Sequence, residues 1–235
     1  MRALSGSDLL NLWERGYGMH AIDRALLALS MALPEASAAL PDWVVGRRNQ
    51  ALIELHRSLF GPNLQAWAVC ESCGEKMEFS IDANALLQQN MSAANSGQTV
   101  VVNGQSFRLP TSRDLADVAQ QNNAQKGALC LMQRCITNAS GPAEWSETEM
   151  EQVGEKMAMA DPLAEIRLSL PCPTCGNETT ETVEVTSFLW GEIEGCARRL
   201  LWEVHAIASA YGWTESEVLS LSPARRARYV EMAQA

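Results

Sequence analysis

Two copies of a five-residue cysteine motif, roughly a hundred residues apart, constrain this chain more than any other feature. The first is Cys-Glu-Ser-Cys-Gly at residues 70–74, and the second is Cys-Pro-Thr-Cys-Gly at residues 172–176. Each tight turn offers two sulfurs to one ion, and its glycine allows the backbone to close behind the second cysteine. The motifs therefore predict one structural Zn²⁺ per chain, held by four thiolates: Cys70, Cys73, Cys172 and Cys175.

Alternating apolar residues flank each motif, which is the period of a half-buried strand. They are Met77, Phe79 and Ile81 after the first motif, Ile166, Leu168 and Leu170 before the second, and Val183 and Val185 in the stretch 179–186 after it. Each motif therefore reads as the turn of a β-hairpin, and two hairpins that share a metal make a zinc ribbon. A redox dithiol and two unrelated loops are the alternatives, but neither motif precedes a helical pattern as a redox pair requires.

The rest of the chain predicts an α+β, mainly helical fold in which the zinc ribbon is interrupted by an inserted domain. Helices are expected from Asp8 to Arg15 with Ser7 as N-cap, at about 20–33, at about 44–60 and from residue 82, followed by a loop at 92–98. Asn103-Gly104 predicts a hairpin turn within 100–109, a helical region then extends to about residue 136, and Ser146 with Glu149 caps a helix that ends near 161. The segments are 1–61 (N-terminal helices), 62–97 (first ribbon half and linker), 98–162 (inserted hairpin-plus-helices domain), 163–190 (second ribbon half) and 191–235 (C-terminal helices).

The charge of the chain argues against nucleic acid as a partner. The formal net charge is −10, and residues 1–69, 70–190 and 191–235 contribute 0, −9 and −1. Affinity for a polyanion depends on Lys and Arg that neutralise phosphates, whereas acidic side chains surround both cysteine motifs. The longest apolar stretch, 25–33, is too short to span a bilayer, so we expect neither a membrane location nor export.

A catalytic constellation is missing from the sequence, and we expect no enzymatic activity and no small-molecule substrate. The three histidines, His20, His56 and His205, form no metal-spaced pair. The remaining cysteines, Cys130, Cys135 and Cys196, read as small core or surface residues, with Cys135 on the apolar side of its helix and Cys130 on the opposite side.

The C-terminal segment contains the clearest amphipathic helix, beginning at about Ile193. Its apolar stripe consists of Ile193, Cys196, Ala197, Leu200, Leu201, Val204, Ile207 and Ala208. Trp202, Arg198 and Arg199 point away from this stripe, a composition typical of an interface anchor. The alternative is that the helix lies between two layers of the same protein. A capping box at Thr214 and Glu217 and a helix start at Ser222-Pro223 follow, and the run Arg225, Arg226 and Arg228 reads as a solvated face.

A series of short phrases follows one another along nearly the whole chain. The phrases are 8–16 (DLLNLWERG), 23–27 (DRALL), 46–49 (GRRN), 60–61 (FG), 78–79 (EF), 109–111 (LPT) with 114–115 (DL), 188–190 (FLW), 199–205 (RLLWEVH), 211–213 (YGW) and 219–222 (LSLS). In this order they resemble the T-even-phage-type baseplate protein family, also named baseplate hub assembly chaperones. The resemblance implies a non-enzymatic assembly factor or structural component of the baseplate of a contractile phage tail or contractile injection system.

The partners that the resemblance implies are baseplate hub or wedge subunits. The location is the bacterial cytoplasm during assembly, or the assembled particle itself. A zinc-ribbon regulator that binds nucleic acid is the alternative function, and the charge opposes it. A metal-dependent hydrolase is a third, and it would need an open position on the metal.

Overall fold

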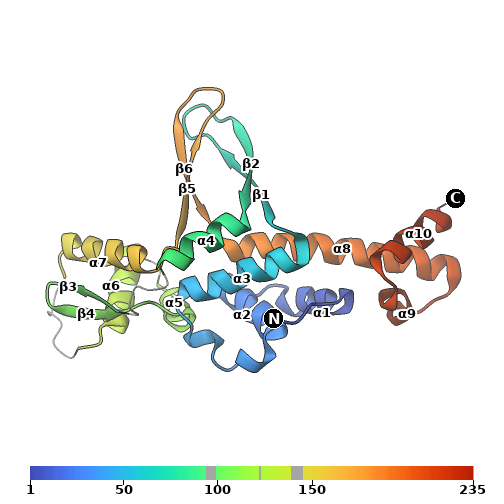
Figure 1. The fold of residues 1–235 in the computed structure, drawn as a ribbon, viewed down its shortest axis with the longest axis horizontal. Helices are drawn as coiled ribbons and strands as arrows, with labels where there is room; N and C mark the ends of the chain where they lie inside the picture. Colours follow the sequence, from blue (N-terminus) through green and yellow to red (C-terminus); the bar gives the residue numbers. More distant parts are fainter. Residues whose placement is uncertain (94–98, 122, 139–144, 235) are drawn as a thin grey trace.

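The computed structural model describes residues 1–93, 99–121, 123–138 and 145–234. In this part of the chain, helices dominate, and the strands form three separate two-stranded antiparallel sheets (Figure 1). The expectation of a mixed, mainly helical fold is therefore confirmed. Most of the loop predicted at 92–98 lies outside the described residues.

Three N-terminal helices, α1 (Gly6–Gly16), α2 (Ala21–Ala32) and α3 (Val45–Phe60), occupy the expected positions. Two short 3₁₀ turns, η1 (Pro34–Ala36) and η2 (Leu40–Asp42), join α2 to α3. The predicted N-cap Ser7 is wrong. The hydroxyl of Ser5 instead accepts the N–H of Asp8, and the Asp8 carboxylate accepts the N–H of Ser5, so this reciprocal pair starts α1 two residues earlier.

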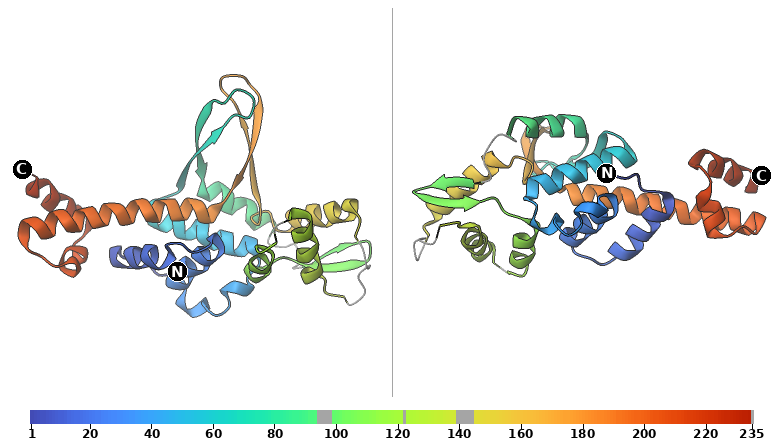
Figure 2. Two further views of the ribbon diagram at one scale, coloured as in Figure 1. Left: turned by 180° about the vertical axis from the view of Figure 1, so that it is seen from behind. Right: turned by 60° about the horizontal axis from the view of Figure 1, so that its bottom comes forward.

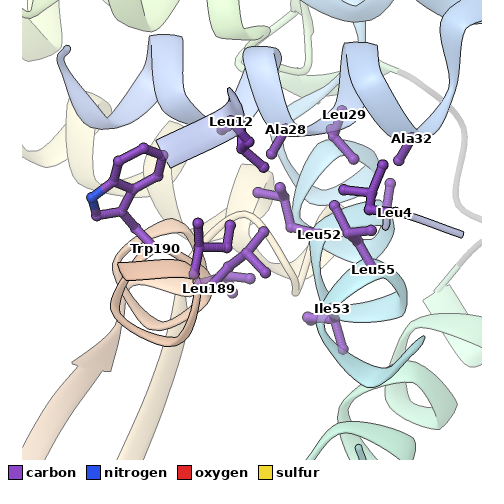
Figure 3. Packing of buried hydrophobic residues seen from close by; sticks show 14 of the residues in the cluster. Leu4, Leu12, Ala28, Leu29, Ala32, Leu52, Ile53, Leu55, Leu189 and Trp190 are labelled. Atoms are coloured by element: carbon purple, nitrogen blue, oxygen red, sulfur yellow. The ribbon is translucent and has the colours of Figure 1, made fainter. Parts of the chain in front are cut away.

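The spine of the molecule is α8 (Val185–Tyr211), a helix of 27 residues against which α1, α2 and α3 pack (Figures 1 and 2). Figure 3 shows how Leu12, Leu29, Leu52 and Leu189 fill the space between these helices. The helix starts earlier than its amphipathic pattern predicts, so the boundary placed between 190 and 191 falls inside it. Val185, predicted in a strand, is buried at the first position of α8 instead.

Two hairpins stand out from this helical body and form what we call the finger, residues 63–82 and 166–183 (Figure 1). They are β1 (Asn63–Val69) with β2 (Lys76–Asp82), and β5 (Ile166–Pro171) with β6 (Glu178–Val183). Leu64, Ala68, Met77 and Ile81 are buried, and Ala66 and Phe79, in phase with them, are half-buried. The alternate residues are exposed, as the alternation predicted. The finger therefore positions both cysteine motifs at its tip.

The segment between the finger hairpins begins with α4 (Ala83–Ala93) and continues as a small module with its own core. The module consists of β3 (Thr99–Val102), β4 (Gln105–Arg108), α5 (Ser112–Val118), α6 (Ala124–Cys135) and α7 (Glu147–Ala160). Asn103 and Gly104 both have positive φ, which confirms the predicted turn. The helical region expected up to residue 136 is two helices, because Asn123 caps a new helix.

The C-terminal end of α8 carries two short helices, α9 (Glu215–Ser220) and α10 (Pro223–Ala233) (Figure 2). Ile207, Val218 and Val230 form a small core between them and α8. The solvated face predicted for the arginines of α10 is wrong for Arg226, which is buried. Its guanidinium donates to Glu203 at 2.8 Å and to the Leu221 carbonyl at 2.7 Å, and thereby fastens α10 to α8.

Candidate metal centre

The two cysteine motifs adopt the same backbone conformation. In the first, the Cys70 carbonyl accepts the N–H of Gly74 and the Cys70 N–H donates to the Glu75 carbonyl, both at 2.9 Å. The second repeats the two bonds at 2.9 Å, from Gly176 to Cys172 and from Cys172 to Asn177. Gly74 and Gly176 share a φ of 74°, which a residue with a Cβ rarely adopts. The role predicted for the glycines is therefore confirmed.

The tertiary fold brings the four cysteine sulfurs together. The Sγ atoms of Cys70 and Cys175 are 3.6 Å apart, those of Cys73 and Cys172 are 3.7 Å apart, and all four lie within 4.8 Å of one another. These separations are far beyond a disulfide bond. Sulfurs at about 2.3 Å from a tetrahedral ion would be about 3.8 Å apart, which matches the two shorter distances. The four cysteines could therefore hold one metal ion.

The surroundings of the cluster keep two of its thiols from solvent. Cys70 and Cys172 are buried beside Ala68 and Met77, with Phe79 and Leu170 packed against them, whereas Cys73 and Cys175 are exposed. A further bond joins the motifs directly, since the side-chain amide of Asn177 donates to the Ser72 hydroxyl at 2.7 Å. Sequence reasoning missed this pair. The sequence shows only a polar residue inside the first motif and another just after the second, which does not identify a contact over a hundred residues.

The thiols of the cluster differ in pKa. The backbone N–H groups of Cys73 and Ser72 lower the pKa of the Cys70 thiol to about 6. A bond from the backbone N–H of Glu75 lowers the pKa of the Cys73 thiol, but partial desolvation and the neighbouring sulfurs outweigh it and raise this pKa to about 12. The pKa of Cys175 is raised as well. A dication between the sulfurs would favour the thiolate form of both groups.

A tetrahedral ion in this cluster would have all four positions filled by protein. Such a site has no place for a water or a substrate, so it can order the chain but cannot activate a nucleophile. Among the described residues, no other cluster of three or more His, Cys, Asp or Glu side chains could hold a metal ion. Cys135 is buried, as expected, while Cys130 and Cys196 are half-buried.

The three histidines have separate positions and do not meet. His20 caps α2, where its Nδ1 atom accepts the N–H of Ile22. His56 is buried, and this burial lowers the pKa of its imidazole. His205 is exposed on α8.

The face predicted for partner binding lies open on α8. Trp202 is 49% exposed, and the side chains of Arg198 and Arg199 are more exposed still. Arg198 pairs with Glu194, one turn earlier on the same helix. This face is therefore not covered by another layer of the described chain. Leu201, expected on the buried stripe, is also exposed.

Comparison with known proteins found no matching family model, no matching curated protein and no matching solved structure. The resemblance to the baseplate family therefore stays a prediction. Within the described residues, the helices lack the combination of length and apolar composition that crossing a membrane requires.

Proposed function

We propose that the cysteine cluster binds one structural Zn²⁺ and that the finger is an interrupted zinc ribbon. The observation that carries this proposal is the spacing of the four sulfurs, which suits a tetrahedral ion. Thiolates are soft donors, and four of them in a tetrahedron select zinc or iron among the common metals. Two cysteine motifs with the same backbone conformation, each at the tip of a hairpin, favour the zinc ribbon arrangement.

The ion would act as a cross-link between distant parts of the chain. The strand β1 directly follows α3, and β6 is directly followed by α8. A metal at the tip would therefore join two hairpins that are each connected to one of these core helices. The inserted module lies between the same hairpins in the sequence. Structural zinc contributes on the order of 10 kcal/mol to the folding of small modules, so its loss should disorder the finger first.

We infer that the protein works by binding other proteins, as an assembly factor or structural component of a contractile-tail or injection-system baseplate. Three features support this: the ordered resemblance along the chain, a cluster of four cysteines that would leave no open position on a tetrahedral ion, and an exposed tryptophan near two arginines on α8. Tryptophan and arginine are the side chains most enriched at energetically dominant interface positions. Hub or wedge subunits are the partners that the resemblance implies.

Nucleic-acid binding is the weaker candidate. Residues 63–82 and 165–184, the finger and its flanking residues, carry eight acidic and two basic side chains. That surface repels phosphate, and thiolates around a dication would add further negative charge. A mobility shift of duplex DNA or RNA at micromolar protein and about 150 mM salt would favour the regulator instead.

The test of the protein-binding role is co-purification with separately expressed hub and wedge subunits. Trp202→Ala should keep the melting temperature and weaken capture of one subunit roughly thirtyfold, as expected for an interface anchor of about 2 kcal/mol. Met159→Ala, which removes another exposed apolar side chain on α7, is the control and should change neither quantity. If Trp202→Ala retains both its melting temperature and its partner, the α8 face is not the interface.

A further inference from the structure

Trp67 is the most exposed tryptophan of the described chain and lies on the finger, far in sequence from the α8 face. Its side chain is 70% exposed, on the outward side of β1 together with Gln65 and Val69. In the register of the hairpin, Trp67 is opposite Glu78, and Val69 is opposite Lys76. An outward indole of this size adds nothing to the core of the finger, so its position needs another explanation.

The indole borders two hollows. One, with a volume of about 310 Å³, lies between β1 and the first turns of α8, where Phe188 and Glu192 form part of its wall. The other, of about 560 Å³, is bordered by Lys76 and Glu78. Trp67 therefore lines both hollows, together with Gln65 and Ala66.

His56 belongs to the wall of the first hollow. The residue is only 1% exposed, yet its Nδ1 atom has no hydrogen-bond partner among the described residues. A buried polar atom of this kind is costly to leave unmatched. The Nδ1 atom is itself enclosed by the protein, so His56 closes the inner end of the hollow.

The negative charge around Trp67 favours a partner with positively charged side chains. The finger and its flanking residues carry a net charge of −6. Glu78 borders one hollow together with Lys76, and Glu192 borders the other. No arginine or lysine of the described chain stacks on Trp67. Elsewhere the protein does form such stacks, with Arg24 at 4.4 Å from the centroid of Trp190 and Arg47 at 4.0 Å from that of Trp43.

We propose that the Trp67 surface docks a basic segment of a protein partner, with an arginine of that segment stacked on the indole near Glu78 and Glu192. The guanidinium group is planar and stacks on aromatic faces while it pairs with carboxylates, which an ammonium group does less well. The surface is separate from the Trp202 face. Loss of binding at one surface need not affect binding at the other. The proposal also does not depend on which particle the protein belongs to.

The experiment uses the full chain labelled with 5-fluorotryptophan, in which the Trp67→Ala variant assigns the ¹⁹F signal of Trp67. The probe is a capped ten-residue peptide of alternating arginine and valine, and a glutamate–valine peptide is its counterpart. We expect the arginine peptide to shift the Trp67 signal, and Trp67→Ala or Glu78→Gln to weaken its binding by about tenfold or more. Trp202→Ala, which removes another exposed indole, should change the affinity by less than about twofold.

Several results would overturn the proposal. These are an unshifted Trp67 signal at millimolar arginine peptide, equal binding of the glutamate peptide, or equal loss of affinity in the Trp202 variant. A Trp67 shift produced equally by duplex DNA or by phosphatidylcholine vesicles would also reject it, since the surface would then select phosphate or lipid rather than a basic segment. Each variant replaces an exposed side chain, and an unchanged melting temperature shows that the fold is retained.

Discussion

Asp114 offers the sharpest test of how the inserted module is held together. Its carboxylate is buried and accepts hydrogen bonds from Arg108 at 2.6 and 2.8 Å and from Arg134 at 3.1 Å. It also accepts the N–H of Thr111 at 2.9 Å and the Thr111 hydroxyl at 2.8 Å. One side chain therefore joins β4, the N-cap of α5, and α6.

The cost of Asp114→Ala follows from these contacts. Loss of a capping interaction costs about 1 kcal/mol, and removal of one partner of a buried ion pair costs roughly 3–5 kcal/mol. Arg108 and Arg134 remain 37% and 36% exposed, so water can solvate them after the change and the cost falls toward the low end. We expect Asp114→Ala to lose roughly 3 kcal/mol of unfolding free energy. Asp114→Asn should lose about 2 kcal/mol, because its amide oxygen can still accept from Thr111.

The effect should depend on pH in a defined direction. Burial alone would raise the pKa of Asp114, but the bonds from Arg108 and Thr111 outweigh it and hold the pKa well below its usual range. Since the folded pKa lies below the unfolded one, the stabilisation is fully present above the unfolded pKa of about 4 and is lost as the pH falls below it. The difference between wild type and Asp114→Ala should therefore shrink in acid.

Urea unfolding followed by the ¹⁹F signal of Trp145 in the 5-fluorotryptophan-labelled chain is the assay, because this indole packs on Phe107 inside the module. The control is Asp42→Ala, which removes an ion pair with Arg113 whose side chains are 61% and 56% exposed. Solvent screens that exposed pair, so it should contribute little to the unfolding free energy. Equal losses for Asp114→Ala and Asp42→Ala, or a deficit for Asp114→Ala that stays constant down to acid pH, would refute the reasoning.

Three further substitutions and a chelation experiment test the helical body and the finger. A Cβ on Gly16 would lie 2.2 Å from the Trp190 ring, so Gly16→Ala should lower the unfolding free energy by roughly 1–3 kcal/mol. The control is Gly195→Ala, where the added Cβ meets open space; it should raise the unfolding free energy by up to about 1 kcal/mol. The carboxylate of Asp161 accepts the N–H of Gly46, and burial raises the pKa of this carboxyl group above its unfolded value. The charged form therefore destabilises the fold at neutral pH. Asp161→Asn should melt at a higher temperature than wild type near pH 7.5, and this difference should disappear near pH 4. A chelator should disorder the finger before α8 unfolds, and hydrogen exchange of the backbone amides can follow both elements. If the finger and α8 lose their protection at the same time, the proposed cross-link within the finger is contradicted.

Local signals in the sequence predicted the local structure well. The glycine-closed cysteine turns, the Asn103-Gly104 hairpin and the capping boxes at Ser146 and Thr214 depend on residues within a few positions, and each appears in the structure. The start of α8 was missed because Val185 suits a strand equally well by composition, and burial at the helix end decided the outcome.

Features that depend on distant contacts could not be read from the pattern. Arg226 reads as a solvated residue until Glu203, on another helix, supplies its counter-ion. Trp67 is out of phase with the buried residues of β1, a signal available in the sequence, but only the fold shows the hollows beside it. The approach of four sulfurs across a hundred residues was predictable because a metal site demands it, whereas the bond between Asn177 and Ser72 was not.

The metal itself is the most direct test of this account. Elemental analysis of the purified chain, combined with X-ray absorption at the zinc edge, should find one zinc per chain with four sulfurs at about 2.3 Å. The Cys70→Ser and Cys172→Ser double variant should lose the ion and melt at a lower temperature than the parent. A chain that contains no zinc, or a double variant that melts like the parent, would contradict the claim that a four-cysteine zinc centre organises this fold.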